Sequence, residues 1–258
     1  MVKAKKSLGQ NWLKNEKIVK EIVAAAKISV GERVVEVGPG QGILTAELLK
    51  TGARVVAIEK DDRLIEELQE KFELEIRSGK LEIIHHDILD FDPIIINEAY
   101  KIVANLPYYI TGEFLKKFLT TPNQPSLMVV MLQKEVAERI VAVPIGRQAR
   151  DKKESVLSLS VKVYGAPKYL KTVPRGNFQP APNVDSAILV IENISKKLFL
   201  ENKISEQEFF SCLKQGFSSK RKKLKNNLNL NDKLLAQYGD KRAEDLQLSD
   251  WLTLCKII

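Results

Sequence analysis

The chain has 258 residues, 44% hydrophobic and 29% charged, which predicts a soluble globular protein long enough for one large domain and one small domain. Its net charge of +8 and pI of about 9.3 favour a polyanionic partner, nucleic acid ahead of a membrane surface. Two widely separated cysteines argue against a cysteine-rich zinc site or a disulfide framework, and no apolar run reaches the roughly 18 residues of a membrane span.

Strand and helix patterns alternate along the first two thirds of the chain. Apolar residues at helical spacing predict helices over 15–27, 43–52, 61–72, 112–119 and 134–141. Short apolar runs predict strands over 33–37, 54–59, 81–87, 101–105 and 126–132. This alternation indicates βαβ units, and therefore a mostly parallel sheet with helices on both faces.

After about residue 164 the pattern changes. Two more strands are predicted over 167–173 and 184–192, joined by a segment rich in proline and glycine. They have no helix between them, so we expect an antiparallel hairpin at one edge of the sheet. From 195 onward only short helical patterns occur, and we therefore expect two domains, 1–194 and 195–258.

The strand over 33–37 runs directly into a glycine-rich loop. Gly38, Gly40 and Gly42 allow the backbone to turn tightly and to approach a ligand closely. The spacing is GxGxG, with Ile43 where a dinucleotide-binding fingerprint has its third glycine. For this loop alone, a tight turn without a ligand remains the alternative.

Three of the predicted strands end in polar side chains. Glu59 follows Gly38 by about twenty residues, the spacing at which an acidic side chain accepts both hydroxyls of a ribose. Asp87 is placed to accept from an adenine amine, and Asn105 ends the next strand. Helix capping could explain Asp87 alone, but three such strand ends beside a glycine loop indicate a ligand site.

These residues carry a resemblance to known enzymes. EVGPGQG (36–42) with Glu59 and Asp87 resembles the S-adenosylmethionine site of Rossmann-like methyltransferases, and NLPY (105–108) resembles the signature of those that methylate adenine amines. Over nearly its whole length the chain is similar to the KsgA/RsmA family of small-subunit (16S) ribosomal RNA adenine dimethyltransferases. The matching segments are SLGQNWL (7–13), FQPAPNVDSA (178–187) and FSSKRKKLKNNL (217–228).

The resemblance implies an α/β, Rossmann-like methyltransferase fold with a mostly parallel seven-stranded sheet and a small C-terminal all-helical domain. Residues 1–194 would bind S-adenosylmethionine and catalyse the reaction, and residues 195–258 would bind RNA. The implied reaction transfers methyl groups to adenine amines of small-subunit rRNA, giving dimethyladenine during ribosome biogenesis. The segment 7–13 would fold over the cofactor. The expected cofactor-binding residues are Asn11, Leu13, Gly38, Gly40, Gly42, Glu59, Asp87 and Asn105.

The NLPY segment suits chemistry on an amine whose lone pair is delocalised into the adenine ring. The side-chain oxygen of Asn105 and the carbonyl of Leu106 can accept from its two hydrogens, which favours the pyramidal, nucleophilic form. Pro107 fixes this corner and has no N–H of its own. Tyr108 offers a stacking face for the extruded base, and the resemblance implies that Phe178 closes the other side. Taken alone, the segment could be an ordinary turn.

No strong general base and no metal is expected, because alignment and electrostatics can supply the catalysis. His85 and His86 are neighbours in a predicted strand, so their side chains should point to opposite faces and cannot chelate one ion. We expect one packed and one partly exposed imidazole.

A basic run is the candidate RNA contact. Leu224 and Leu228 stand at helical spacing within it and predict a helix with cations along one exposed side. Its cations are Lys220, Arg221, Lys222, Lys223 and Lys225, and a second basic group comprises Lys3, Lys5 and Lys6. A solvated helix face is the alternative. A target adenine must lie in a loop or be flipped out, since a paired and stacked amine is inaccessible.

Two other functions stay open at this point: an Erm-type large-subunit rRNA methyltransferase, and a non-catalytic RNA- or DNA-binding factor on the same fold. The intact NLPY segment and acidic strand ends argue against loss of catalysis. We expect a cytoplasmic monomer that acts on small-subunit rRNA within a pre-ribosomal particle, with S-adenosylmethionine as methyl donor and no membrane association.

Overall fold

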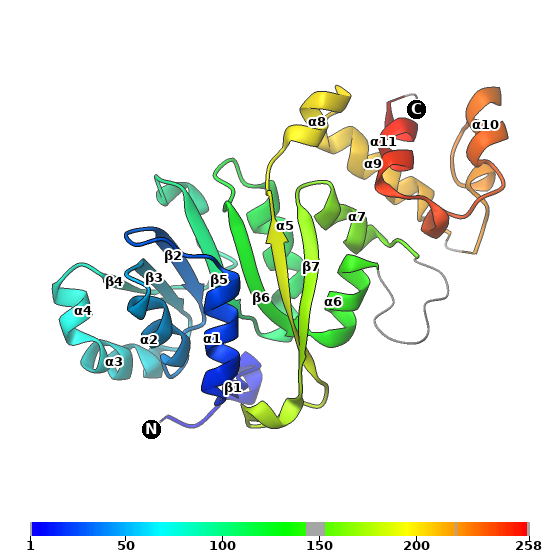
Figure 1. The fold of residues 1–258 in the computed structure, drawn as a ribbon. Coiled ribbons are helices and arrows are strands. Elements are labelled where there is room, and N and C mark those ends of the chain that lie inside the picture. The colour runs from blue at the N-terminus through cyan, green and yellow to red at the C-terminus, as the bar shows by residue number, and fades with distance from the viewer. Residues whose placement is uncertain (1, 143–152, 220, 257–258) are drawn as a thin grey trace. The chain divides into compact units, whose positions relative to one another are not determined.

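The computed structural model describes residues 2–142, 153–219 and 221–256 (Figure 1). The predicted RNA-binding residue Lys220 lies outside these ranges. The chain divides into two compact units, one formed by Met1–Ala137 with Lys168–Ile194 and the other by Glu138–Pro167 with Ser195–Ile258. Each unit is described separately below.

The first unit is built on a seven-stranded sheet with the strand order β4-β3-β2-β5-β6-β9-β7. The strands are β2 (Arg33–Val37), β3 (Arg54–Glu59), β4 (Leu81–His85), β5 (Tyr100–Asn105), β6 (Leu127–Gln133), β7 (Ala166–Val173) and β9 (Ser186–Glu192). Strands β4, β3, β2, β5 and β6 pair in parallel, whereas β9 is antiparallel to β6 and separates it from the edge strand β7. The predicted mostly parallel sheet is confirmed, with the two late strands at one edge.

The central strands read as continuous apolar runs because both of their faces are covered. Along β5, Ile102, Val103 and Ala104 are all fully buried although successive side chains point to opposite faces. The helices of this part of the chain are α1 (Glu16–Ala25), α2 (Ile43–Lys50), α3 (Asp62–Lys71), α4 (Glu73–Arg77), α5 (Thr111–Thr120) and α6 (Lys134–Val141). One hydrophobic cluster joins α1, α2 and α3 to the sheet.

The second unit is helical where the chain after 195 is described. Its helices are α7 (Val156–Lys162), α8 (Lys197–Asn202), α9 (Glu206–Gly216), α10 (Asp232–Tyr238) and α11 (Leu248–Cys255). Trp251 of α11 is fully buried beside Gly216, where a Cβ atom would lie 2.3 Å from the indole ring. Gly216 therefore allows α9 and α11 to pack closely.

The compact units differ from the predicted domains in one respect: residues 138–167 group with the C-terminal helices. The ring of Tyr164 packs on Phe199 with centroids 5.3 Å apart, and the Ser195 N–H donates to the Tyr164 carbonyl at 2.8 Å. The N–H of Glu154 donates to the carbonyl of Glu244 at 2.8 Å. The domain division at 194 stays a prediction. Within the described ranges, no helix combines the length and apolarity that a bilayer crossing requires.

Candidate active site

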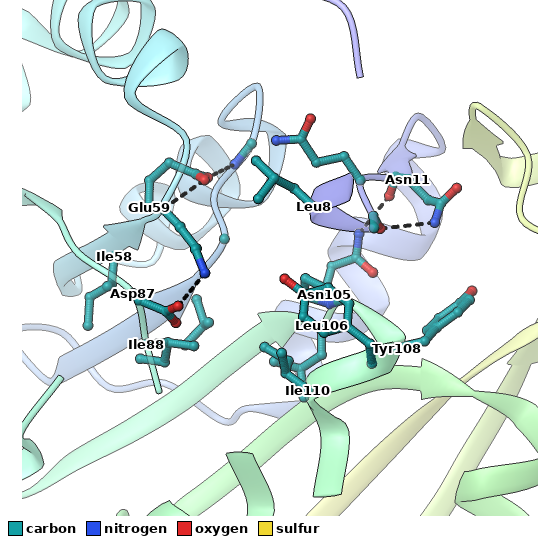
Figure 2. Close-up of a pocket in the computed structure, with 18 of the residues that line it drawn as sticks. Leu8, Asn11, Ile58, Glu59, Asp87, Ile88, Asn105, Leu106, Tyr108 and Ile110 are labelled. Atoms are coloured by element: carbon teal, nitrogen blue, oxygen red, sulfur yellow. Dashed lines mark hydrogen bonds and ion pairs between the residues drawn. The ribbon is translucent and has the colours of Figure 1, made fainter. Parts of the chain in front are cut away.

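A cleft opens where β2, β3 and β5 end, and Figure 2 shows the side chains that line it. It contains about 780 Å³ of empty space, part of it open to solvent, a size typical of sites for small molecules. Its walls come from the N-terminal segment 8–12, the glycine loop, the ends of β3 and β5, and the loop after β4. The predicted site residues found together here are Asn11, Gly38, Gly40, Glu59, Asp87, Asn105, Leu106, Pro107 and Tyr108.

Three predicted site residues do not line this cleft. Gly42 is the N-cap of α2 at φ 75°, and a Cβ atom there would lie 2.5 Å from the ring of Phe72, so this glycine serves close packing. Leu13 and Phe178 pair across the short strands β1 (Trp12–Leu13) and β8 (Phe178–Gln179). Phe178 is only 2% exposed and belongs to the hydrophobic cluster, so the stacking role predicted for its ring stays a prediction.

The carboxylate of Glu59 lines the cleft and is bound by three backbone donors. It accepts hydrogen bonds from the backbone N–H groups of Gly40 at 3.1 Å, Lys60 at 2.9 Å and Asp61 at 2.9 Å. Burial raises the pKa of Glu59, and these three donors favour its charged form against that effect. The same contacts tie the glycine loop to the end of β3, so the loop and the carboxylate are presented together.

Asp87 is engaged on both carboxylate oxygens. One oxygen accepts from the Leu89 N–H at 2.9 Å, a local turn contact, and the other accepts from the Lys60 ammonium group. Partial burial opposes the charge of Asp87, but Lys60 and the Leu89 N–H outweigh it and lower the pKa of the carboxyl group. A ligand amine bound at Asp87 would share it with Lys60.

The N-terminal segment is held over the glycine loop from both sides. On one side β1 pairs with β8, and the Lys14 N–H donates to the Asn177 carbonyl at 2.9 Å. On the other side the amide of Gln10 donates to Asp61 at 2.7 Å. Between these anchors the indole ring of Trp12 lies against Gly40, where a Cβ atom would be 3.1 Å from the ring, and this explains the glycine.

Asn105, the last residue of β5, is oriented by this segment. Its amide nitrogen donates to the backbone carbonyl of Asn11 at 3.1 Å (Figure 2). Within the described ranges no donor reaches its side-chain oxygen, which is therefore available to a ligand. The next peptide is fixed as well, because the Leu106 N–H donates to the Met131 carbonyl of β6 at 3.0 Å.

Tyr108 is half-buried and anchored through its hydroxyl group. That hydroxyl lies 2.8 Å from the hydroxyl of Ser186, the buried first residue of β9, and the Thr111 hydroxyl donates to the Tyr108 carbonyl at 3.1 Å. Burial raises the pKa of the Tyr108 phenol, so it is neutral at physiological pH. Ser186 was not predicted as this partner, although it belongs to the segment FQPAPNVDSA.

Glu36 is a buried carboxyl group for which the sequence analysis predicted no role beyond the motif. It is fully buried near the end of β2 and lines a smaller cavity next to the cleft, together with Gly38 and Asn105. No described residue hydrogen-bonds to either carboxyl oxygen. Burial raises its pKa to about 8; the nearby Thr45 favours the charged form, and the charge of Glu59 opposes it.

The predicted basic helix is wrong. Helix α9 ends at Gly216, residues 221–223 form a bend and an isolated bridge to Arg242, and only Leu224–Asn226 form a 3-10 turn. Leu224 is buried as expected, but its N–H donates to the Lys241 carbonyl at 2.9 Å, and this long-range contact replaces the helical pattern.

The cations of this basic segment differ in their surroundings. All four described cations are exposed, but Lys223 and Lys225 both contact Asp240, at 2.9 Å and 2.8 Å, whereas Arg221 and Lys222 have no such contact among the described residues. His85 and His86 are both exposed, so the prediction that one of these two imidazoles is packed is wrong. Among the described residues there is no group of three or more side chains suited to hold a metal ion.

Comparisons with known proteins agree with this geometry. A family model described as ribosomal RNA adenine dimethylase matches residues 1–258. "Ribosomal RNA small subunit methyltransferase A" of Dehalococcoides mccartyi is 40% identical over 98% of this chain and 88% of its own length. The protein of the same name from Thermosynechococcus vestitus is 37% identical over 100% of this chain and 98% of its own.

Solved structures show the same likeness in three dimensions. A dimethyladenosine transferase from Plasmodium falciparum superposes with a TM-score of 0.77 at 27% identity, covering 94% of this chain and 95% of the other. The 23S rRNA methyltransferase ErmE gives a TM-score of 0.75 at 23% identity over 95% of this chain and 98% of its own, a likeness of fold.

Proposed function

The chain belongs to the ribosomal RNA adenine dimethylase family, and from that premise we propose that it transfers methyl groups from S-adenosylmethionine to adenine amines of small-subunit rRNA. The product is dimethyladenine, formed during biogenesis of the small ribosomal subunit. The observation that carries the proposal is the environment of Asn105, which lines the cleft with its amide nitrogen bound to Asn11 and its side-chain oxygen without a donor among the described residues. The relatives that share most of this chain carry the small subunit in their names.

The residues around the cleft suit S-adenosylmethionine. A Cβ atom on Gly38 would meet nothing within 4 Å, so this glycine leaves its backbone open to a ligand rather than to packing. Glu59 would accept from the ribose hydroxyls, and Asp87 from the adenine amine of the cofactor. Asn11 and the glycine loop would hold the remainder. The cofactor supplies an electrophilic methyl group on a sulfonium.

The target adenine would enter the cleft beside Tyr108, whose anchored ring offers a rigid stacking face. Its amine would donate to the Asn105 side-chain oxygen and the Leu106 carbonyl, and these contacts favour the pyramidal form with a free lone pair. Neither Asn105 nor Tyr108 carries a charge at neutral pH, so they align and polarise the amine rather than remove its proton. Phe178, which the family resemblance places on the other side of the base, is not among the residues that line the cleft, so that role stays a prediction.

The partner of the protein is small-subunit rRNA within a pre-ribosomal particle. We propose that the protein binds this particle as a cytoplasmic monomer and needs no metal. We assign RNA binding to residues 195–258 and catalysis to residues 1–194. Arg221 and Lys222 are the exposed cations of the basic segment best placed to meet phosphates, because Lys223 and Lys225 already share Asp240.

The direct test is methyl transfer to purified particles followed by mapping of the product. Small and large subunits from cells that lack this gene are incubated separately with the protein and methyl-labelled S-adenosylmethionine, and the rRNA nucleosides are analysed by mass spectrometry. We expect dimethyladenine in small-subunit rRNA. Label in large-subunit rRNA would instead support the Erm-type activity, and RNA binding without transfer would support a non-catalytic factor.

A further inference from the structure

Tyr109 is an exposed aromatic residue at the same cleft. It lines the cleft next to Tyr108 yet is 60% exposed. Within the part of the chain that the structure describes, its hydroxyl makes no hydrogen bond and its ring has no aromatic partner. A single exposed ring is unremarkable by itself. Tyr109 differs from such a ring because it lines the cleft and lies against the backbone of Gly9.

The ring of Tyr109 rests against a glycine. Gly9 ends the short 3-10 turn Lys6–Leu8 at φ 64°, and a Cβ atom there would lie 3.2 Å from two carbons of the Tyr109 ring and 3.4 Å from Pro107. Only a glycine therefore lets the ring rest against this part of the backbone without displacement. One side of the ring is therefore covered by the backbone of this segment, and the exposed remainder is open to a flat ligand.

The two consecutive tyrosines lie in different surroundings. They occupy one 3-10 turn, Tyr108–Ile110, in which neighbouring side chains diverge by roughly 120°. Tyr108 is tied to the sheet through Ser186, whereas Tyr109 stays at the solvent-exposed rim. An adenine extruded toward Asn105 would leave the next nucleotide of the strand outside the cleft, and that nucleotide would have lost one stacking neighbour.

We propose that Tyr109 is the stacking platform for the base adjacent to the methylated adenine, an inference that rests on the proposed function. The surrounding charge suits a nucleotide. Lys5 and Lys6 are exposed in the segment that leads to Gly9. Cations there can neutralise the phosphates on either side of the stacked base. The platform replaces the stacking energy that the flanking base gives up when its neighbour is extruded.

The test combines a protein change with an RNA change. The wild type, Tyr109→Leu and the matched control Tyr109→Phe are compared on RNA oligonucleotides that carry the mapped adenine with its natural neighbours. Two further oligonucleotides have an abasic nucleotide on the 5′ or the 3′ side of that adenine. Dissociation constants are measured for all nine pairs, together with the affinity for S-adenosylmethionine and the thermal midpoint of each protein.

We expect Tyr109→Leu to weaken binding of the natural RNA by about 5- to 150-fold, the effect of losing one stacked base. One of the two abasic oligonucleotides should lose a similar factor with the wild type and Tyr109→Phe, but not with Tyr109→Leu. Cofactor affinity and thermal midpoint should be unchanged.

Equal binding by Tyr109→Leu and the wild type would overturn the proposal, and so would abasic penalties that are the same in both. A loss of cofactor affinity in Tyr109→Leu would also overturn it and place the ring in the cofactor site. The oligonucleotides carry an adenine that the wild type has already been shown to methylate, so these results judge the role of Tyr109, whereas a wild type that methylates no adenine would overturn the proposed function itself.

Discussion

The amide nitrogen of Asn105 donates to the backbone carbonyl of Asn11 at 3.1 Å, although the two residues lie 94 positions apart in the chain. One contact thus joins the segment over the glycine loop to the amide at the end of β5. Because the nitrogen is used in this way, the side-chain oxygen is the polar atom of Asn105 that is left for a ligand in the cleft. Placement of the N-terminal segment and preparation of the amine acceptor are therefore coupled.

Glu59→Ala should weaken S-adenosylmethionine binding by about 1–3 kcal/mol, because the ribose hydroxyls lose charge-assisted hydrogen bonds. It also frees the N–H of Gly40, so the glycine loop should loosen. Titration calorimetry at a temperature where circular dichroism shows a folded variant measures the effect. Glu66→Ala on the exposed side of α3 is the matched control and should bind normally. Unchanged affinity in folded Glu59→Ala would remove Glu59 from the site.

Glu36→Gln should stabilise the cofactor-free protein increasingly as pH rises. Burial raises the folded-state pKa of Glu36 from 4.5 to about 8. Below the lower value both states are protonated; above it the unfolded state ionises first, so the wild type loses stability until about pH 8. The difference in thermal midpoint between the variant and the wild type should therefore grow from about pH 5 to pH 8.

Glu32→Gln provides a control of opposite sign for that experiment. Burial opposes the charge of Glu32, but the hydrogen bonds from Lys101 and the Ser29 N–H outweigh it and lower its pKa. Its ionised form therefore stabilises the fold above the unfolded pKa, and this contribution is lost as pH falls through the folded pKa. Removing it should destabilise the protein at neutral pH. A pH-independent difference for Glu36→Gln would mean that this carboxyl group is ionised in the fold.

Asp240→Asn should strengthen RNA binding and steepen its salt dependence. Asp240 forms ion pairs with both Lys225 and Lys223, and these two cations lower its pKa to about 2. Removing its charge therefore frees both cations to contact phosphates. Each added phosphate contact should change the slope of log K against log salt by about 0.7–0.9. Asp232→Asn makes the same charge change at an exposed position of α10 and serves as the control. Equal slopes for the two variants would show that Lys223 and Lys225 gain no phosphate contact when Asp240 is neutralised.

The features of the site that could be predicted are those that depend on strand ends. Glu59 and Asn105 each terminate a parallel strand, and the sheet brings such ends to one edge whatever the loops do. The glycine loop follows the same logic, since a positive φ at Gly38 and Gly40 leaves few other residues possible.

The features that could not be predicted depend on partners distant in sequence. Leu224 and Leu228 have helical spacing, yet the bond from Leu224 to Lys241 places them in a turn instead. Phe178 pairs with Leu13 across β1 and β8 and belongs to the hydrophobic cluster. The residues next to them in the sequence indicate neither the contact between Leu224 and Lys241 nor the pairing of Leu13 with Phe178.

The most direct test of the account is single-turnover methyl transfer by Asn105→Ala. Small ribosomal subunits that lack the modification are mixed with excess protein and labelled S-adenosylmethionine, and binding of both substrates is measured in parallel. The Asn105 oxygen acts on the amine as it becomes pyramidal, so its contribution grows toward the transition state. We expect the rate to fall on the order of 10²–10³-fold while both affinities stay near the wild-type values. Tyr108→Ala should differ by weakening RNA binding as well. A near-normal rate for Asn105→Ala would mean that this segment is only a turn, and the mechanism would be wrong.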